Sequence, residues 1–135
     1  MRLLLDLGNS RLKWALQGPA PAWLAQGVLE WREDLATLAG AAWAGFPRST
    51  RVVGASVVDD AREQRVAAVV RQAFGSAPEW LRTPASACGV RNAYAEPQRL
   101  GVDRFLAMVA AHASHRAPCV LASAGTALVL DALAA

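Results

Sequence analysis

Apolar and polar positions along the chain follow two periods, the two-residue alternation of strands and the three-to-four-residue spacing of helices. Residues 3–5 form a short apolar run, and residues 12–16 place apolar side chains at every second position. This pattern predicts a β-hairpin whose turn lies at residues 6–10. Residues 22–29 are expected to add a third antiparallel strand.

The next part of the chain reads as helices alternating with buried strands. Apolar spacings of three and four predict an amphipathic helix over residues 34–43. A second helix is predicted between an aspartate cap at position 59 or 60 and Gly75, which ends it. Strands predicted at residues 51–56 and 79–81 flank this helix. A strand, helix, strand unit favours parallel pairing of its two strands.

The periodicity disappears over residues 83–99, which are rich in Pro, Gly and Asn. A loop of that length within a compact domain tends to be functional. Beyond it we expect a helix over residues 100–115 and a buried strand over residues 119–122.

The chain then repeats its opening pattern of strand, small-residue turn and strand. The turn is predicted at residues 123–126, and the strand after it at residues 127–130, ending at Asp131. The turns of two such hairpins in one mixed sheet could bind a polyphosphate from two sides. We therefore expect Asp6 and Gly125 at one end of a single sheet.

Composition indicates a globular domain of 135 residues, with 54% hydrophobic and 19% charged residues. The net charge of +3 comes from scattered arginines, so the basic stripe of a nucleic-acid-binding protein is missing. No stretch has the pattern of a signal peptide or a membrane span, so we expect a cytoplasmic protein without a membrane partner. Cys88 and Cys119 lie in no metal-binding spacing.

The first predicted turn combines a carboxylate, a glycine, an amide and a hydroxyl, in the order Asp6, Leu7, Gly8, Asn9, Ser10. Gly8 can take a positive φ or allow a ligand close to the backbone, and the neighbouring polar groups can converge on an anion. A carboxylate beside an anion site is useful when a cation such as Mg²⁺ lies between them. A plain β-turn at Gly8 and Asn9 is the alternative.

Three segments together resemble type III pantothenate kinase: DLGNSRLKWAL at residues 6–16, RNAYAEPQRLGVDR at 91–104 and SAGTALVLD at 123–131. That family has an α/β fold of the actin-like ATPase and ribonuclease H-like type, with a mixed central sheet and flanking helices. Its members transfer the γ-phosphate of ATP to pantothenate, the first step of coenzyme A synthesis, and one branch is named as accessory transcription factors. The resemblance implies a homodimer. It also implies that residues 1–135 are the first actin-like domain, ending just after the second phosphate turn, with the second domain absent or truncated.

The resemblance also implies residue roles, and the chemistry of phosphoryl transfer agrees with them. Such a reaction needs a phosphate cradle, a metal anchor and a group that orients the attacking hydroxyl. Asp103 resembles the catalytic base, and Asp6 the anchor for Mg²⁺ held through the phosphates. The expected ATP phosphate ligands are Asp6, Gly8, Asn9, Ser10, Lys13, Gly125 and Thr126. The expected pantothenate ligands are Asn92, Tyr94, Gly101 and Arg104, of which the last offers a fixed cation for a carboxylate.

Ser123 departs from the commoner family pattern. Many members carry an aspartate there, which resembles part of a site for a monovalent cation, K⁺ or NH₄⁺. Serine offers an oxygen without a charge, which weakens the expectation of direct cation binding at this position.

Other interpretations of the same residues stay open. Asp103 and Arg104 also fit ordinary charge at a helix N-terminus, Tyr94 a loop anchor, and Lys13 a solvated strand lysine. A nuclease or resolvase on the same kind of fold would use Asp6, Asp103 and Asp131 as metal-binding carboxylates. A third possibility is a regulatory protein that keeps the kinase fold without turnover.

Overall fold

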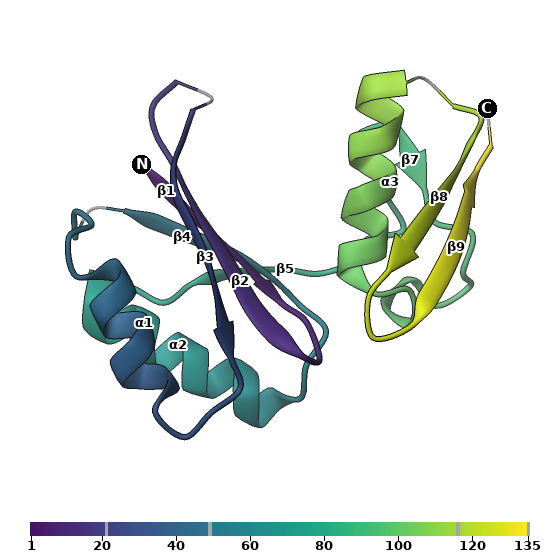
Figure 1. Ribbon diagram of the computed structural model, residues 1–135. Coiled ribbons are helices and arrows are strands. Elements are labelled where there is room, and N and C mark those ends of the chain that lie inside the picture. Colours follow the sequence, from purple (N-terminus) through teal and green to yellow (C-terminus); the bar gives the residue numbers. More distant parts are fainter. Residues whose placement is uncertain (21, 49, 116, 135) are drawn as a thin grey trace. The chain divides into compact units, whose positions relative to one another are not determined.

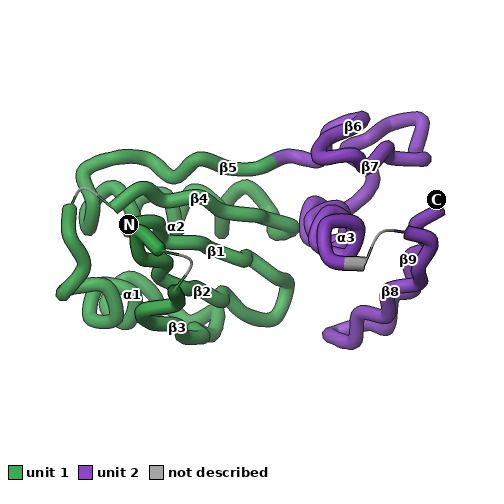
Figure 2. The backbone as a smooth tube through the Cα atoms, turned by 90° about the horizontal axis from the view of Figure 1, so that it is seen from above, with its two compact units in different colours: residues 1–81 green, residues 82–135 purple. Residues whose placement is uncertain are grey.

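The computed structural model describes residues 1–20, 22–48, 50–115 and 117–134. It forms two compact units, Met1–Leu81 (unit 1) and Arg82–Ala135 (unit 2), which are coloured separately in Figure 2. Among the described residues, no helix has the length and apolar character needed to span a membrane.

Unit 1 is built on a five-stranded mixed sheet, with strands in the order β3-β2-β1-β4-β5 (Figure 1). The strands are β1 (Arg2–Leu7), β2 (Arg11–Gln17), β3 (Trp23–Glu30), β4 (Arg51–Ser56) and β5 (Glu79–Leu81). The first three pair antiparallel, whereas β4 lies parallel to both β1 and β5. The predicted opening hairpin, third strand and parallel unit are therefore confirmed, and β1 is the central strand.

Two helices, α1 (Leu35–Trp43) and α2 (Asp60–Phe74), pack on one face of this sheet (Figure 1). The predicted ends of α2 are confirmed, because the Asp59 side chain accepts a hydrogen bond from the Arg62 N–H at 2.9 Å and Gly75 closes the helix with φ 77°. The strand period turns alternate β1 side chains toward the helices. The resulting core contains Leu3, Leu5, Leu7, Leu12, Leu16, Leu35, Ala39, Trp43, Val52, Val66, Val69, Val70 and Phe74.

Unit 2 begins with the segment for which the sequence predicts a loop, residues 83–99. It contains a small hairpin of β6 (Ser86–Ala87) and β7 (Val90–Arg91), followed by the 3₁₀ turn η1 (Pro97–Arg99). Cys88 and Gly89 form the hairpin turn, with φ values of 50° and 81°. Strands of two residues are too short to show a period, so the sequence pattern did not indicate this hairpin within the predicted loop.

The rest of unit 2 is helix α3 (Val102–His115) followed by a hairpin of β8 (Cys119–Ala124) and β9 (Leu128–Leu133). β8 and β9 pair with each other in a two-stranded sheet of their own, so the prediction of one sheet holding both hairpins is wrong. The predicted strand ends also need correction, because Ser123 lies within β8 and β9 continues past Asp131. Ser123 pairs opposite Val129, since small side chains do not interrupt a β-ladder.

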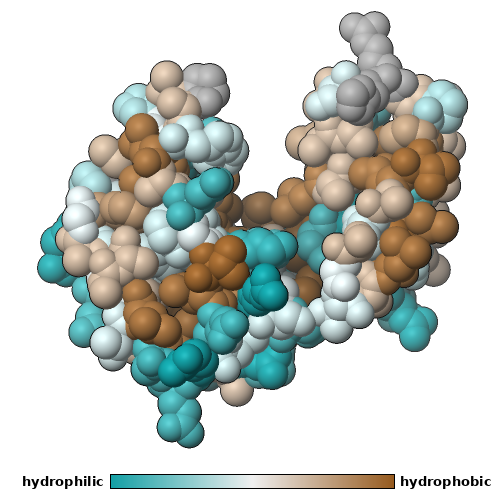
Figure 3. Space-filling model, in the orientation of Figure 1, coloured by the Kyte–Doolittle hydropathy of each residue, from teal (hydrophilic) through white to brown (hydrophobic). Residues whose placement is uncertain are grey.

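The two faces of the β8–β9 hairpin differ. One face packs on α3 through Leu121 and Leu133, in a core with Val90, Leu100, Phe105 and Met108. The other face exposes Val120, Leu128 and Leu130, with 71%, 70% and 64% of their surface accessible. Figure 3 shows hydrophobic residues gathered over this hairpin. We call the exposed side the outer face of the β8–β9 hairpin.

Candidate functional site

The turn between β1 and β2 is fixed by hydrogen bonds on both sides of Gly8. Its N–H donates to the Arg11 carbonyl at 3.0 Å, and its own carbonyl accepts from Trp31 Nε1 at 2.9 Å. Gly8 does not take the positive φ that the sequence suggested, because the hairpin closes with ordinary backbone geometry. Asn9 and Ser10 are exposed at the tip of the turn.

Asp6 and Lys13 are direct partners across the β1–β2 ladder. Lys13 Nζ lies 3.5 Å from Asp6 Oδ2, and the two side chains are 63% and 46% exposed. Lys13 is therefore both a surface lysine and a neighbour of the predicted metal anchor. An exposed pair of this kind adds little stability, so both groups remain available to a ligand.

Trp31 is a site residue that the sequence interpretation missed. It follows β3, and the Arg62 guanidinium lies over its ring at 5.6 Å from the ring centre. The C=O and N–H of one peptide unit point in opposite directions. By holding the Gly8 carbonyl, Trp31 fixes the direction of the Asn9 N–H. A Trp directly after a strand gives no local sign of such a long-range bond.

In unit 2, Asn92 organises the segment before α3. Its side-chain oxygen accepts from the Tyr94 N–H at 3.0 Å and its Nδ2 donates to the Pro97 carbonyl at 3.1 Å. The buried hydroxyl of Thr83 donates to the Leu100 carbonyl at 2.7 Å and so joins the two ends of this segment. Asn92 thus shapes the loop that presents Tyr94, instead of pointing freely into a ligand site.

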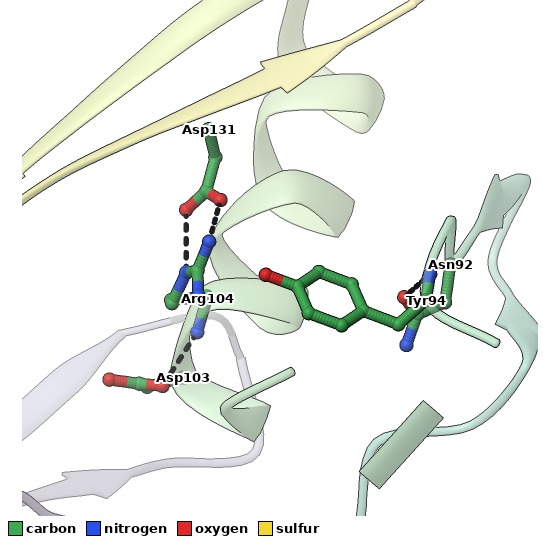
Figure 4. A network of polar contacts seen from close by, with 5 residues as sticks. All are labelled: Asn92, Tyr94, Asp103, Arg104 and Asp131. Carbon is green, nitrogen blue, oxygen red and sulfur yellow. Dashed lines mark hydrogen bonds and ion pairs between the residues drawn. The ribbon is translucent and has the colours of Figure 1, made fainter. Parts of the chain in front are cut away.

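Gly101, Asp103 and Arg104 lie together where α3 begins. The Gly101 carbonyl accepts from the Phe105 N–H at 3.1 Å, which starts the helix. Asp103 Oδ1 accepts from the Arg104 N–H at 2.8 Å. Figure 4 shows the other carboxylate oxygen of Asp103 pointing away from this contact.

Arg104 makes a two-point ion pair with Asp131 of β9 (Figure 4). Its Nε lies 3.0 Å from Asp131 Oδ2, and its Nη2 bonds to Oδ1. The hydrogen bonds that Arg104 donates to Asp131 raise the pKa of Arg104 above its usual value. Desolvation lowers that pKa, and the Tyr94 hydroxyl makes a smaller contribution that raises it. Figure 4 shows that hydroxyl pointing at the guanidinium.

This pair disfavours Asp131 as a metal ligand in the nuclease alternative. Asp131 places both carboxylate oxygens on Arg104, so a metal ion bound there would compete with this ion pair. The sequence interpretation missed the pairing. The sequence holds one sign of the pairing. Asp131 lies two residues before Leu133 on β9, so its carboxylate is on the strand face that packs on α3.

The second predicted phosphate turn joins β8 to β9. The Gly125 N–H donates to the Ala127 carbonyl at 3.1 Å, and beyond the two neighbouring residues no atom lies within 4 Å of the place that a Cβ would take at Gly125. Ser123 and Thr126 are exposed. Because β8 runs back along α3, the turn lies at the end of unit 2 where α3 begins (Figure 1).

The predicted residues thus fall into two groups. Unit 1 brings together Asp6, Gly8, Asn9, Ser10 and Lys13, and unit 2 brings together Asn92, Tyr94, Gly101, Asp103 and Arg104 near the Gly125 turn. The expected approach of Gly8 and Gly125 joins different units and stays a prediction.

Comparisons with known proteins identify the family of the chain. The family model described as type III pantothenate kinase matches residues 2–135. A type III pantothenate kinase of Aromatoleum aromaticum is 44% identical over 136 residues, which cover 100% of this chain and 54% of the relative. Those of Laribacter hongkongensis and Thiobacillus denitrificans are 44% and 42% identical, over 98% of this chain and 53% and 51% of their own lengths. The chain therefore spans about half the length of the curated relatives it matches. It belongs to the type III pantothenate kinase family.

Proposed function

We propose that this chain carries the pantothenate-binding and catalytic residues of a kinase that transfers the γ-phosphate of ATP to pantothenate, the first step of coenzyme A biosynthesis. One observation supports this most directly. A carboxylate, a guanidinium and a phenol hydroxyl meet at the start of α3, in Asp103, Arg104 and Tyr94 (Figure 4). Pantothenate carries a hydroxyl to be phosphorylated and a carboxylate to be recognised.

In this proposal Asp103 orients the substrate hydroxyl and takes its proton. The Arg104 N–H fixes one carboxylate oxygen, so the other can face the hydroxyl in a defined direction. Arg104 and Tyr94 bind the substrate carboxylate, since a guanidinium offers a planar pair of donors that matches a carboxylate. Asn92 holds the backbone at Tyr94, and Gly101 accepts the hydrogen bond that starts the helix carrying Asp103 and Arg104.

The ATP phosphates are proposed to lie at the two turns, with Mg²⁺ anchored by Asp6. Mg²⁺ in phosphate sites keeps several waters and takes one or two carboxylates besides the phosphates, so a single half-exposed Asp6 fits it without a cage of protein ligands. When bound, the ion neutralises charge on the phosphates. Asn9, Ser10 and Lys13 of the first turn, and Gly125 and Thr126 of the second, supply the remaining contacts. Ser123 would give a monovalent cation only an uncharged oxygen.

We further propose an actin-like, ribonuclease H-like fold and a homodimer for the whole protein. The strand order 3-2-1-4-5 of unit 1, with three antiparallel and two parallel-joined strands, supports the fold. Residues 1–135 would then form the first actin-like domain up to the second phosphate turn. Two-fold symmetric homodimers are the commonest oligomers among soluble proteins, which supports a homodimer here.

The proposal is tested by magnesium-dependent consumption of ATP with pantothenate. We expect little turnover from residues 1–135 alone, because closure around the nucleotide excludes water in kinases with moving domains. Co-expression with the part of the Aromatoleum aromaticum relative that this chain does not match should restore turnover. Binding of neither ATP nor pantothenate under any of these conditions would favour the regulatory alternative, and cleavage of branched DNA would favour the nuclease.

A further inference from the structure

The carboxylate of Asp131 is the least exposed ionised group around the proposed substrate site. Its side chain is 9% exposed, and that of its partner Arg104 is 27% exposed. A shielded pair with two parallel contacts holds both side chains in one geometry, unlike an exposed ion pair. The proposed function gives Asp131 no role in binding or catalysis, so the burial of its carboxylate needs a separate explanation.

Asp131 engages only one edge of the Arg104 guanidinium. Arginine has five N–H donors in a planar fork. Asp131 takes the Nε donor and one donor on Nη2, which form one edge. The second edge, formed by Nη1 and the other Nη2 donor, has the spacing that a second carboxylate needs. Tyr94, which is 44% exposed, brings its hydroxyl to the same guanidinium (Figure 4).

Asp131 has two opposite effects on a bound anion. Its negative charge offsets that of Arg104 and weakens the attraction. Its contacts also fix a long, rotamer-rich side chain before the ligand arrives, so that less ordering is left to occur on binding. The shielding of Asp131 and the two-point contact favour the second effect, because a carboxylate ligand gains most from a guanidinium already in the correct plane.

We propose that Asp131 is a positioning residue for substrate recognition: it holds one edge of Arg104 and thereby directs the other edge at the carboxylate of the substrate. This inference rests on the proposed function, since it concerns the same site. Asp131 also follows the Gly125 turn on β9, so the cation of the pantothenate site is fixed by the strand that leaves the second phosphate turn.

The test compares two ligands that differ at one group. Pantothenate is titrated into residues 1–135 by calorimetry, alongside pantothenol, which has a primary alcohol in place of the carboxylate. The variants are Asp131→Asn, which keeps the size and removes the charge, and Asp131→Glu, which keeps the charge. Glu96→Gln is the matched control, because it removes one negative charge from an exposed position in the same unit.

We expect Asp131→Asn to bind pantothenate roughly three- to tenfold more weakly, with pantothenol binding unchanged. Asp131→Glu should recover part of the loss, and Glu96→Gln should change neither ligand. A purely structural role would weaken both ligands together, and equal or tighter pantothenate binding would show that the charge effect dominates. Either result would overturn the inference while the wild type still binds pantothenate. Failure of the wild type to bind either ligand would instead overturn the proposed function, and the inference with it.

A second measurement needs no ligand and covers the case in which Asp131→Asn folds poorly. In the wild type, nuclear magnetic resonance should show the Arg104 Nε–H protected from solvent exchange, because it donates to Asp131. The same signal should exchange faster in Asp131→Glu, whose carboxylate lies one methylene further out. An unprotected Nε–H in the wild type would contradict the pairing on which the inference depends.

Discussion

Unit 1 and unit 2 bury their apolar residues in different ways. Unit 1 has a central strand covered by neighbours on both sides and by two helices, so its core is enclosed within the unit. Its exposed apolar side chains, such as Trp23 and Leu24, are concentrated on edge strand β3. Unit 2 has a small core around one helix and leaves the outer face of the β8–β9 hairpin uncovered.

This difference implies that the more stable unit and the unit with the proposed catalytic residues are not the same. The polar groups of unit 1 lie on a hairpin of the five-stranded sheet, whereas those of unit 2 lie on a loop, a helix start and a two-stranded sheet. Elements with few buried contacts are the ones that open most readily. We therefore expect the proposed catalytic residues to lie on the less stable unit, and the following experiments test that contrast.

The largest expected effect concerns Asp103 in an active form of the protein. Asp103→Asn should lower turnover by about two to four orders of magnitude, because it removes the proposed base while keeping the side-chain size. Affinity for ATP should change little, whereas Asp6→Asn in unit 1 should weaken it. Steady-state kinetics with nucleotide titration distinguishes the two. Weaker ATP affinity in Asp103→Asn, with turnover at saturating ATP preserved, would assign that residue to the metal instead.

Phe105→Ala should separate the stabilities of the two units. It removes a fully buried ring from the small core of unit 2, at a cost of about 3–5 kcal/mol. Hydrogen exchange should then show unit 2 opening while the amides of β1 and β4 stay protected. Phe74→Ala, in the core of unit 1, is the matched control and should expose those strands. Simultaneous loss of protection in both units for either variant would mean that they unfold as one.

The outer face of the β8–β9 hairpin should drive self-association of residues 1–135. Leu130→Ser should weaken association by about one to two orders of magnitude, because one buried leucine side chain is worth roughly 1.5–3 kcal/mol. Light scattering over a dilution series measures this. Leu24→Ser in β3 is the control, since Leu24 is an exposed leucine of unit 1. If the Leu24 variant dissociates and the Leu130 variant does not, edge strand β3 of unit 1 is the surface that mediates self-association.

Two glycines of unit 1 should respond to alanine in opposite directions. A Cβ at Gly54 would lie 2.3 Å from the Trp80 ring, so Gly54→Ala should destabilise by about 1–3 kcal/mol. Gly40 lies inside α1 with no atom within 4 Å of its Cβ position, so Gly40→Ala should stabilise by roughly 0.5–1 kcal/mol. Denaturant titration gives both values. A stable Gly54→Ala protein would show that the Trp80 ring moves easily and that unit 1 is less tightly packed than described.

The elements of unit 1 could be predicted from sequence because local signals and tertiary packing agree there. Asp59 and Gly75 mark the ends of α2 by their own backbone chemistry, and strand alternation marks β1 and β2. In unit 2 the short β6–β7 hairpin carries no period. The pairing of β8 with β9 alone depends on which strands are near, which a local pattern does not record.

The candidate site was predictable to a similar degree. Neighbours in sequence, such as Asp103 and Arg104, could be assigned together because one motif carries them. The contacts of Trp31 with Gly8 and of Asp131 with Arg104 span 23 and 27 residues, and each depends on the fold being formed. The sequence alone leaves Asp131 open as a metal ligand, because a lone carboxylate at a strand position does not reveal its partner.

The bond between Trp31 and the Gly8 carbonyl gives the protein an optical probe of its own. An indole whose N–H is tied to a turn, with the Arg62 cation over its ring, emits at a wavelength set by those charges. A phosphate arriving at Asn9 and Ser10 would change the electric field at that ring without touching it. The fluorescence of Trp31, isolated as the difference from Trp31→Phe, can therefore follow occupation of the first turn in real time and without a label.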